Sequence, residues 1–118
     1  MGSDIVTRRR FPRIEAQDAV HLRRIGPEVM ETCGKTRQIG LGGCTFVNRE
    51  PIGRGSAVDL LISIKPHRVI QAVGRVVYEK PIQQDRFEVG VEFLSISPSD
   101  RAVLESLFQP EPRSARDD

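Results

Sequence analysis

Four arginines lie close together near the start of the chain: Arg8, Arg9, Arg10 and Arg13. A guanidinium group presents paired donors that match phosphate oxygens and the O6 and N7 acceptors of guanine, and its flat face can stack on a purine. Because the 118-residue chain has a net charge of only +2, the cluster is a local feature of the chain. We expect residues 1–13 to form a flexible cationic arm; taken alone, the cluster favours a solvated, disordered end or an electrostatic patch for any polyanion over an arm that binds one ligand.

A glycine-rich segment begins 25 residues after Arg13 and reads Gln-Ile-Gly-Leu-Gly-Gly over positions 38–43. Glycine adopts positive φ angles without steric cost, so Gly40 and Gly43 predict a tight turn with exposed backbone amides. Such amides can bind an anion, and the Gln38 side chain offers a carbonyl acceptor beside them. The turn is thus a second candidate ligand-binding element, although a turn of this composition can also form without any ligand.

Other reactive side chains are few. Cys33 and Cys44 form no CxxC pair, and only His21 and His67 could join them in a metal site, so we expect two reduced, buried thiols and no metal. The sequence also lacks a phosphate-binding P-loop, a GxSxG nucleophile motif and an HExxH zinc motif. We therefore expect neither a cofactor nor catalysis.

The chain has the size and composition of one soluble domain. Hydrophobic residues make up 38% of it and charged residues 29%, which supports a modest core. No run approaches the roughly 20 apolar residues needed to span a bilayer, and no apolar signal segment stands at the amino terminus, so we expect a cytoplasmic protein without a membrane partner. Residues 109–118 contain two prolines and no large apolar side chain, which predicts a disordered tail.

Short apolar stretches separated by glycine and proline predict an all-β domain over residues 14–108, a six-stranded antiparallel barrel. The expected strands cover roughly residues 19–25, 29–39 (interrupted near Cys33), 44–47, 57–64, 69–78 and 87–93. Asp59 and Glu88, which lie within two of these strands, are expected to be ordinary solvent-facing residues.

One C-terminal helix is marked by Ser97, a suitable N-cap, followed by proline and then by Asp100, which favours the positive end of the helix. Its apolar residues share one face, which we expect to pack across one barrel opening. These residues are Val103, Leu104, Leu107 and Phe108.

Several of these elements together resemble a known family. Arg9 and Arg13 form an RxxxR motif, and residues 38–43 lie where PilZ domains carry a (D/N)xSxxG turn. Residues 74–77 and 90–94 are similar to the later strands of that family, and a terminal helix follows. The resemblance to PilZ domains covers roughly residues 8–108.

PilZ domains are receptors for cyclic di-GMP, so the resemblance implies this ligand, with Arg9 and Arg13 holding its guanines and phosphates and with Arg8 and Arg10 adding phosphate contacts. Gln38 replaces the acidic or amide residue of the turn, and Gly40 replaces its serine. A guanine donor that loses its acceptor costs about 1–3 kcal/mol, which would weaken binding without abolishing it. Glycine would in turn let the ligand approach the backbone more closely.

Two functions follow from this resemblance. In the first, ligand binding closes the arginine arm and switches the interaction with a protein partner. In the second, the altered turn has lost the nucleotide, and the domain is a ligand-independent adaptor. We do not expect a nucleic acid partner, because five Phe, one Tyr and no Trp supply few stacking platforms.

Overall fold

The computed structural model describes residues 13–26, 28, 30–64 and 68–108. Within these ranges the chain forms seven strands and one helix, whose bounds are β1 Arg13–Glu15, β2 Ala19–Arg24, β3 Met30–Gly40, β4 Gly43–Asn48, β5 Ala57–Ile64, β6 Arg68–Gln83, β7 Arg86–Ile96 and α2 Pro98–Ser106. No helix in this part of the chain has the length and apolar character needed to cross a membrane. The predicted tail, residues 109–118, lies outside the described residues.

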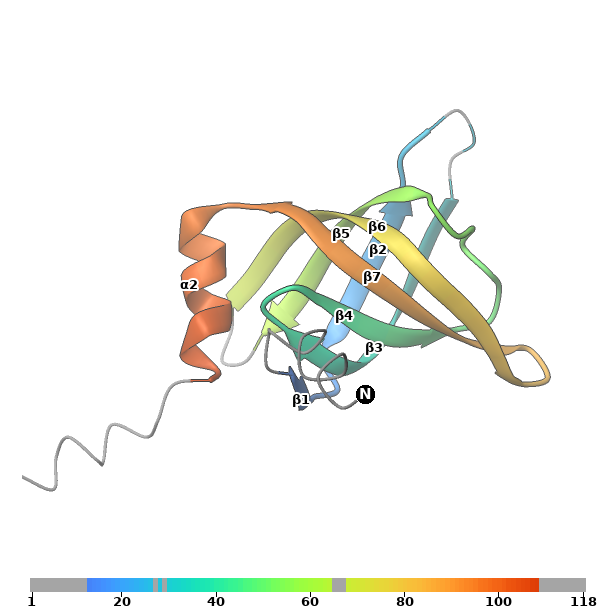
Figure 1. Ribbon diagram of the computed structural model, residues 1–118, viewed down its shortest axis with the longest axis horizontal. Helices are drawn as coiled ribbons and strands as arrows, with labels where there is room; N and C mark the ends of the chain where they lie inside the picture. Colours follow the sequence, from blue (N-terminus) through green and yellow to red (C-terminus); the bar gives the residue numbers. More distant parts are fainter. Residues whose placement is uncertain (1–12, 27, 29, 65–67, 109–118) are drawn as a thin grey trace, which may run out of the picture.

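Six strands close into an antiparallel barrel (Figure 1). The order around the sheet is β3, β2, β5, β6, β7 and β4, and β4 pairs back to β3. The predicted six-stranded barrel with one C-terminal helix is therefore confirmed. The short strand β1 is an addition: it pairs with residues 38–40 of β3, beyond the stretch of β3 that β2 covers.

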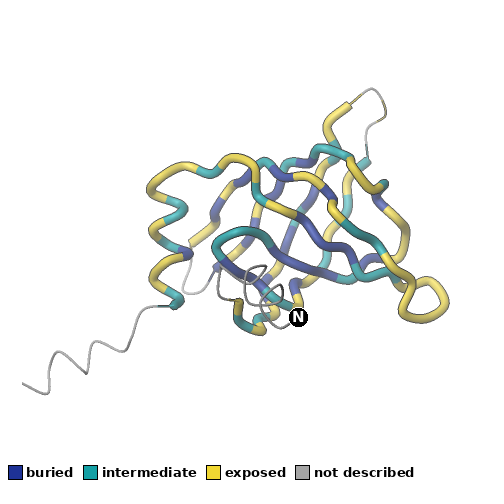
Figure 2. Tube along the Cα trace, viewed as in Figure 1, coloured by how far each residue is buried: buried dark blue, intermediate teal, exposed yellow. Residues whose placement is uncertain are grey.

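Alternate side chains along the strands fill the barrel interior. Along β5, Val58, Leu60, Ile62 and Ile64 are buried, because successive residues of a strand point to opposite faces of the sheet. Figure 2 shows the buried positions distributed along the strands through the body of the barrel. Phe46 of β4 is the largest fully buried side chain in the described chain.

The helix forms as its sequence predicts. The Ser97 side chain accepts a hydrogen bond from the backbone N–H of Asp100 at 3.1 Å and so caps the first turn. Leu104 is fully buried, and Val103 and Leu107 pack against the same core. Figure 1 shows α2 standing at one end of the barrel, beside the start of β6.

Strands β6 and β7 are longer than predicted and extend to a two-residue turn at Gln84 and Asp85. Residues 80–86 are exposed, so no burial alternation marks this part of the ribbon in the sequence. The strands continue because they still pair with each other. Asp85 closes the turn with a φ of 60°, a conformation that aspartate tolerates better than most residues.

Strand β3 also departs from the prediction. It runs without interruption through Cys33, and its irregular pairing lies between Thr36 and Gln38, where Arg37 is an extra residue relative to β4. Such a bulge bends the strand and changes the direction of its side chains. The expectation of two buried thiols is wrong for Cys33, which is exposed. Cys44 is buried, and this burial raises its thiol pKa to about 12.

The link between β1 and β2 is held from β3 by Thr36, a buried residue. Its hydroxyl donates to the backbone carbonyl of Ala16 and accepts from the backbone N–H of Asp18 at 2.9 Å. The backbone N–H of Thr36 in turn donates to the Asp18 carbonyl at 2.9 Å. One side chain thereby fixes the path by which the chain enters the barrel.

The loop between β4 and β5 is anchored by Glu79 of β6. Its carboxylate accepts hydrogen bonds from the backbone N–H of Ile52 and, at 3.1 Å, from that of Gly53. Arg24 donates to the Ile52 carbonyl at 2.6 Å, and the Ile52 side chain is buried. The loop therefore depends on charged groups from two different strands.

We expect Glu79→Gln to lower the free energy of unfolding by about 1.5–3 kcal/mol, because it removes the charge that strengthens both hydrogen bonds and turns one of the two acceptor atoms into a donor. Chemical denaturation measures the change. The matched control is Glu105→Gln, which removes an exposed helix ion pair with Arg101 at 3.4 Å and should cost no more than about 0.5 kcal/mol. Equal losses in the two variants would contradict the anchoring role of Glu79.

Candidate functional site

A hollow of about 290 Å³ opens on the outer face of the barrel. It is built from β1, the β3–β4 turn and residues of β4, β6 and β7. Its lining residues are Arg13, Gly40, Gly42, Gly43, Cys44, Thr45, Val77, Tyr78, Gly90, Val91 and Glu92. We call it the glycine-lined hollow.

Strand pairing explains where this hollow lies. Gln38 of β3 is paired with Thr45 of β4, Thr45 with Gly90 of β7, and Gly90 with Tyr78 of β6. The row therefore has long side chains at its ends and small ones in its middle. Because directly paired residues point to the same face of a sheet, the small residues leave a depression between Gln38 and Tyr78.

The glycines matter because they let neighbouring strands approach each other closely, and not because they adopt turn conformations. The expectation of positive φ angles in the 40–43 turn is wrong: among the described glycines only Gly26, Gly53 and Gly55 have them. A Cβ atom on Gly43 would lie 2.1 Å from the backbone oxygen of Val91, so only glycine lets β4 approach β7 there.

Gly90 leaves room for a neighbouring side chain. A Cβ atom at this position would lie 2.3 Å from a ring carbon of Tyr78, so the Tyr78 ring rests directly over the backbone of β7. The irregular pairing of β6 between Val76 and Tyr78 places Val77 on the same hollow. Together Val77 and Tyr78 give the glycine-lined hollow one apolar and aromatic wall.

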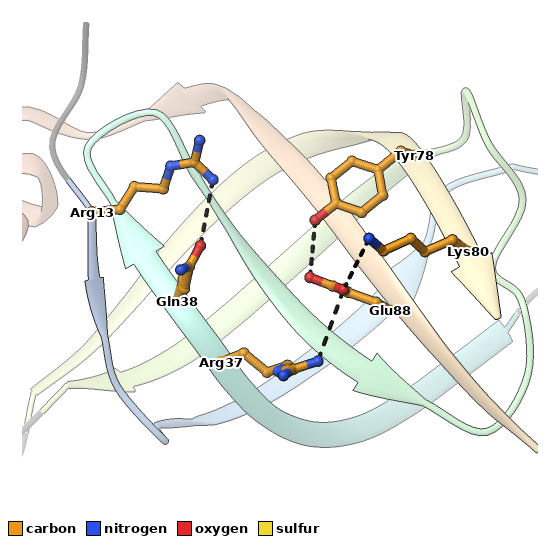
Figure 3. Close-up of polar contacts among 6 residues, drawn as sticks. All are labelled: Arg13, Arg37, Gln38, Tyr78, Lys80 and Glu88. Atoms are coloured by element: carbon orange, nitrogen blue, oxygen red, sulfur yellow. Dashed lines mark hydrogen bonds and ion pairs between the residues drawn. The ribbon is translucent and has the colours of Figure 1, made fainter. Parts of the chain in front are cut away.

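Tyr78 belongs to a charged cluster centred on Glu88 (Figure 3). The Tyr78 hydroxyl donates to Glu88 Oε2 at 3.2 Å, and Glu88 Oε1 lies 3.8 Å from both Lys80 Nζ and Arg37 Nη1. The Glu88 side chain is only 18% exposed, so the expectation of an ordinary solvent-facing residue is wrong. Its alternation with Gly90 along β7 is the signal that could have placed it on this face.

A second hollow, of about 450 Å³, adjoins the first. We call it the polar hollow. Its lining residues are Glu15, Ala16, Gln17, Thr36, Arg37, Gln38, Thr45 and Glu88. Thr45 lines both hollows, and its Oγ1 atom is buried without a hydrogen-bond partner among the described residues. Buried hydroxyls in proteins are normally paired, so this atom calls for an explanation.

The residues that the sequence singled out come together where the structure describes them. Arg13 begins β1, is paired with Gly40, and its Nη1 lies 3.5 Å from Gln38 Oε1 (Figure 3). Gly40 and Gly43 line the glycine-lined hollow beside Arg13. The other three predicted site residues, Arg8, Arg9 and Arg10, lie outside the described residues. Sequence reasoning missed Thr45, Tyr78 and Arg37.

No metal centre is evident in this part of the chain. The described ranges hold no group of three or more His, Cys, Asp and Glu residues that could bind a metal ion. Cys44 lines the glycine-lined hollow, but its raised pKa keeps the thiol protonated and unreactive near neutral pH. The chemistry available at the face is therefore hydrogen bonding, stacking and charge.

Comparison with protein families gives one match: the model of the PilZ domain matches residues 7–109. A comparison with curated proteins finds no match.

Solved structures with the same fold are also found. YcgR from Escherichia coli in complex with c-di-GMP has a TM-score of 0.70 and 18% identity, and the match covers 93% of this chain and 48% of that one. The inhibitor of motility MotI/DgrA from Bacillus subtilis has a TM-score of 0.68 and 20% identity, with 82% and 47% covered. The PilZ domain of Escherichia coli YcgR with c-di-GMP has a TM-score of 0.64 and 18% identity, with 93% and 95% covered. This chain thus spans about half the length of the first two.

Tyr78 offers a direct test of the cluster geometry. Burial, and then the charge and hydrogen bond of Glu88, raise the phenol pKa above its ordinary value, while Arg13 and Arg37 oppose the rise. Because the folded state favours the protonated phenol, its contribution to stability is present below about pH 10 and is lost as pH rises through the raised value.

We expect Glu88→Gln to lower the Tyr78 pKa, since the charge that disfavours tyrosinate is removed. Alkaline titration followed by ultraviolet absorbance reports Tyr78 alone, because the chain has one Tyr and no Trp. Glu31→Gln, an exposed change elsewhere on β3, should leave the titration unchanged. An unchanged or higher pKa in Glu88→Gln would show that the carboxylate does not interact with the phenol as described.

Proposed function

Because the family model matches most of its length, this chain belongs to the PilZ domain family, and we propose that it is a receptor for cyclic di-GMP that switches a protein interaction. The observation that carries the proposal is the glycine-lined hollow, which is already formed and has Arg13 on its lining. Structures of the similar YcgR protein contain this ligand, which supports the choice.

The walls of the hollow suit a purine base. Val77 and Tyr78 present apolar and aromatic surface on which a base can stack, and the Tyr78 ring lies directly over Gly90. Arg13 supplies a charged fork for a phosphate or for the O6 and N7 acceptors of guanine. Apolar surface and a guanidinium together match a ligand made of purines and phosphates.

Arg13 also determines what the preceding arginines can reach. Arg9 stands four residues before Arg13, so its Cα lies within about 14 Å of that of Arg13 in any chain conformation. We propose that Arg8, Arg9 and Arg10 contact the phosphates and guanines of a ligand held in the hollow. Closure of the segment 1–13 over the ligand would change the surface that a protein partner meets.

Gln38 replaces a carboxylate in this arrangement without removing the acceptor. Its Oε1 faces Arg13 at 3.5 Å, a distance longer than a typical hydrogen bond, so the contact is easily exchanged for a ligand. Once Arg13 turns to a phosphate or guanine, the Gln38 carbonyl is available to a guanine donor.

We propose no catalytic role for the protein. We further propose that it acts in the cytoplasm, where soluble second messengers act.

We expect saturable binding of cyclic di-GMP in isothermal titration calorimetry, with cyclic di-AMP and GTP binding more weakly. Arg13→Ala should weaken the affinity about 10- to 100-fold, the range for a hydrogen-bonded charge. Because Arg13 is exposed at the start of β1, the thermal unfolding midpoint should change little.

Arg23→Ala is the matched control for this test. Arg23 is an exposed arginine on β2 that pairs with Asp59 and lines neither hollow, so its loss should leave the affinity unchanged. Equal weakening by both variants would contradict a specific role for Arg13. No heat of binding and no thermal shift with the wild-type protein would contradict the receptor and favour the ligand-independent adaptor.

A further inference from the structure

The polar hollow has the composition of a base-reading site. It adjoins the glycine-lined hollow through Thr45, and it combines two carboxylates, two side-chain amides and a guanidinium around one space larger than a purine. Apolar wall residues are nearly absent from its lining, in contrast to the wall formed by Val77 and Tyr78. Hydrogen bonding to the edge of a ligand is therefore what this second hollow offers.

Arg37 reaches the polar hollow because of the bulge in β3. The pairing of β3 with β4 shifts between Thr36 and Gln38, and both Arg37 and Gln38 line the hollow. The Arg37 side chain is 52% exposed, so its guanidinium is free to move toward a ligand. Without the bulge, neighbouring residues of a regular strand would point to opposite faces.

Arg37 and Glu88 lie next to each other on the lining of this hollow. The closest distance between Arg37 Nη1 and Glu88 Oε1 is 3.8 Å, which is an ion pair but longer than a hydrogen bond. Lys80 lies equally far from the same oxygen. Glu88 Oε1 can therefore still accept a hydrogen bond from a ligand, and the Arg37 guanidinium can still donate hydrogen bonds to one.

Given the proposed function, on which this inference rests, we infer that one guanine of the ligand is read in the polar hollow by Glu88 and Arg37. The Glu88 carboxylate accepts from the N1–H and N2–H groups of guanine, which lie side by side. Arg37 donates to its O6 and N7 acceptors. Glu88 thereby supplies the carboxylate that Gln38 does not.

The same pair rejects adenine. Adenine carries a donor amino group where guanine has O6, an acceptor at N1, and no amino group at C2. Arg37 would then face a donor, and Glu88 would face a lone pair, so both interactions would be lost or repulsive. The polar hollow is thus the part of the face that sets the choice of base.

Thr45 gives an independent reason to place a ligand here. Only 5% of Thr45 is exposed, the residue lines both hollows, and its buried hydroxyl has no hydrogen-bond partner among the described residues. A ligand that spans the two hollows passes this hydroxyl and can pair with it once the Thr45 side chain turns to the ligand. The lack of a partner is then explained, because the hydroxyl forms its hydrogen bond only when the ligand is bound.

The decisive experiment compares the affinities for cyclic di-GMP and cyclic di-AMP in the wild type and in Glu88→Gln. We expect the preference for cyclic di-GMP to fall about tenfold or more, because one of two acceptor atoms becomes a donor. Glu31→Gln makes the same chemical change on an exposed side chain and should keep the wild-type preference. An unchanged preference in Glu88→Gln, or equal weakening of both ligands, would overturn the inference.

Two further variants decide the matter if Glu88→Gln folds poorly. Arg37→Lys keeps the charge of an exposed residue but removes its fork, and the preference should again fall; an unchanged preference overturns the role of Arg37. Thr45→Val removes the unpaired hydroxyl, so stability should hold or rise while affinity for cyclic di-GMP falls about tenfold. Unchanged affinity in Thr45→Val overturns the contact with Thr45.

The outcomes also separate this inference from the receptor proposal. If the wild type binds cyclic di-GMP selectively and Glu88→Gln keeps that selectivity, only the reading of guanine by Glu88 is wrong. If the wild type binds neither dinucleotide, the receptor proposal fails, and the inference fails with it.

Discussion

The face of this barrel depends on one close approach of backbone to backbone. At Gly43 the chain of β4 passes so near the Val91 oxygen of β7 that a Cβ atom would lie 2.1 Å from it. The turn that precedes Gly43 is fixed to the same strand, because the Phe93 N–H donates to the Gly42 carbonyl at 2.8 Å. This contact closes the sheet between β4 and β7, and the row from Gln38 to Tyr78 exists only because the sheet is closed.

Because the sheet is closed, each strand has one side that faces the core and one side that faces outward. Cys44 and Val91 point to the core, whereas their neighbours Thr45 and Gly90 lie on the outer row. Burial keeps the Cys44 thiol protonated, so the side of the site that faces the core offers no nucleophile or metal ligand. The polar groups Glu88, Arg37 and Tyr78 are all on the other side, where a ligand can reach them.

Which features could be predicted from the sequence depends on whether they arise from residues close together in the chain or from contacts between different strands. The barrel and its helix were predicted, because apolar stretches bounded by glycine and proline and a capping serine are local patterns, as in β5 and at Ser97. Arg13, Gln38 and Gly43 were found as a motif, and the structure brings them to one face. Arg37 and Val77 were not predicted as site residues, because each is an extra residue in a bulge that depends on the partner strand. Glu88 was expected to face solvent because its three partners lie on other strands.

In the proposed receptor, strand β1 provides a means of adjusting the apparent affinity for the ligand. It is the shortest strand of the described sheet, with three residues, and it pairs only with β3, so it is expected to open at lower free energy than the other strands. A ligand that needs Arg13 in place binds only the fraction of molecules in which β1 is docked, and its apparent dissociation constant rises as that fraction falls. The concentration at which such a receptor responds is therefore a property of the docking equilibrium as well as of the contacts. A substitution at Ile14, which packs against the core and lines neither hollow, could then shift the response threshold while every group that contacts the ligand stays the same.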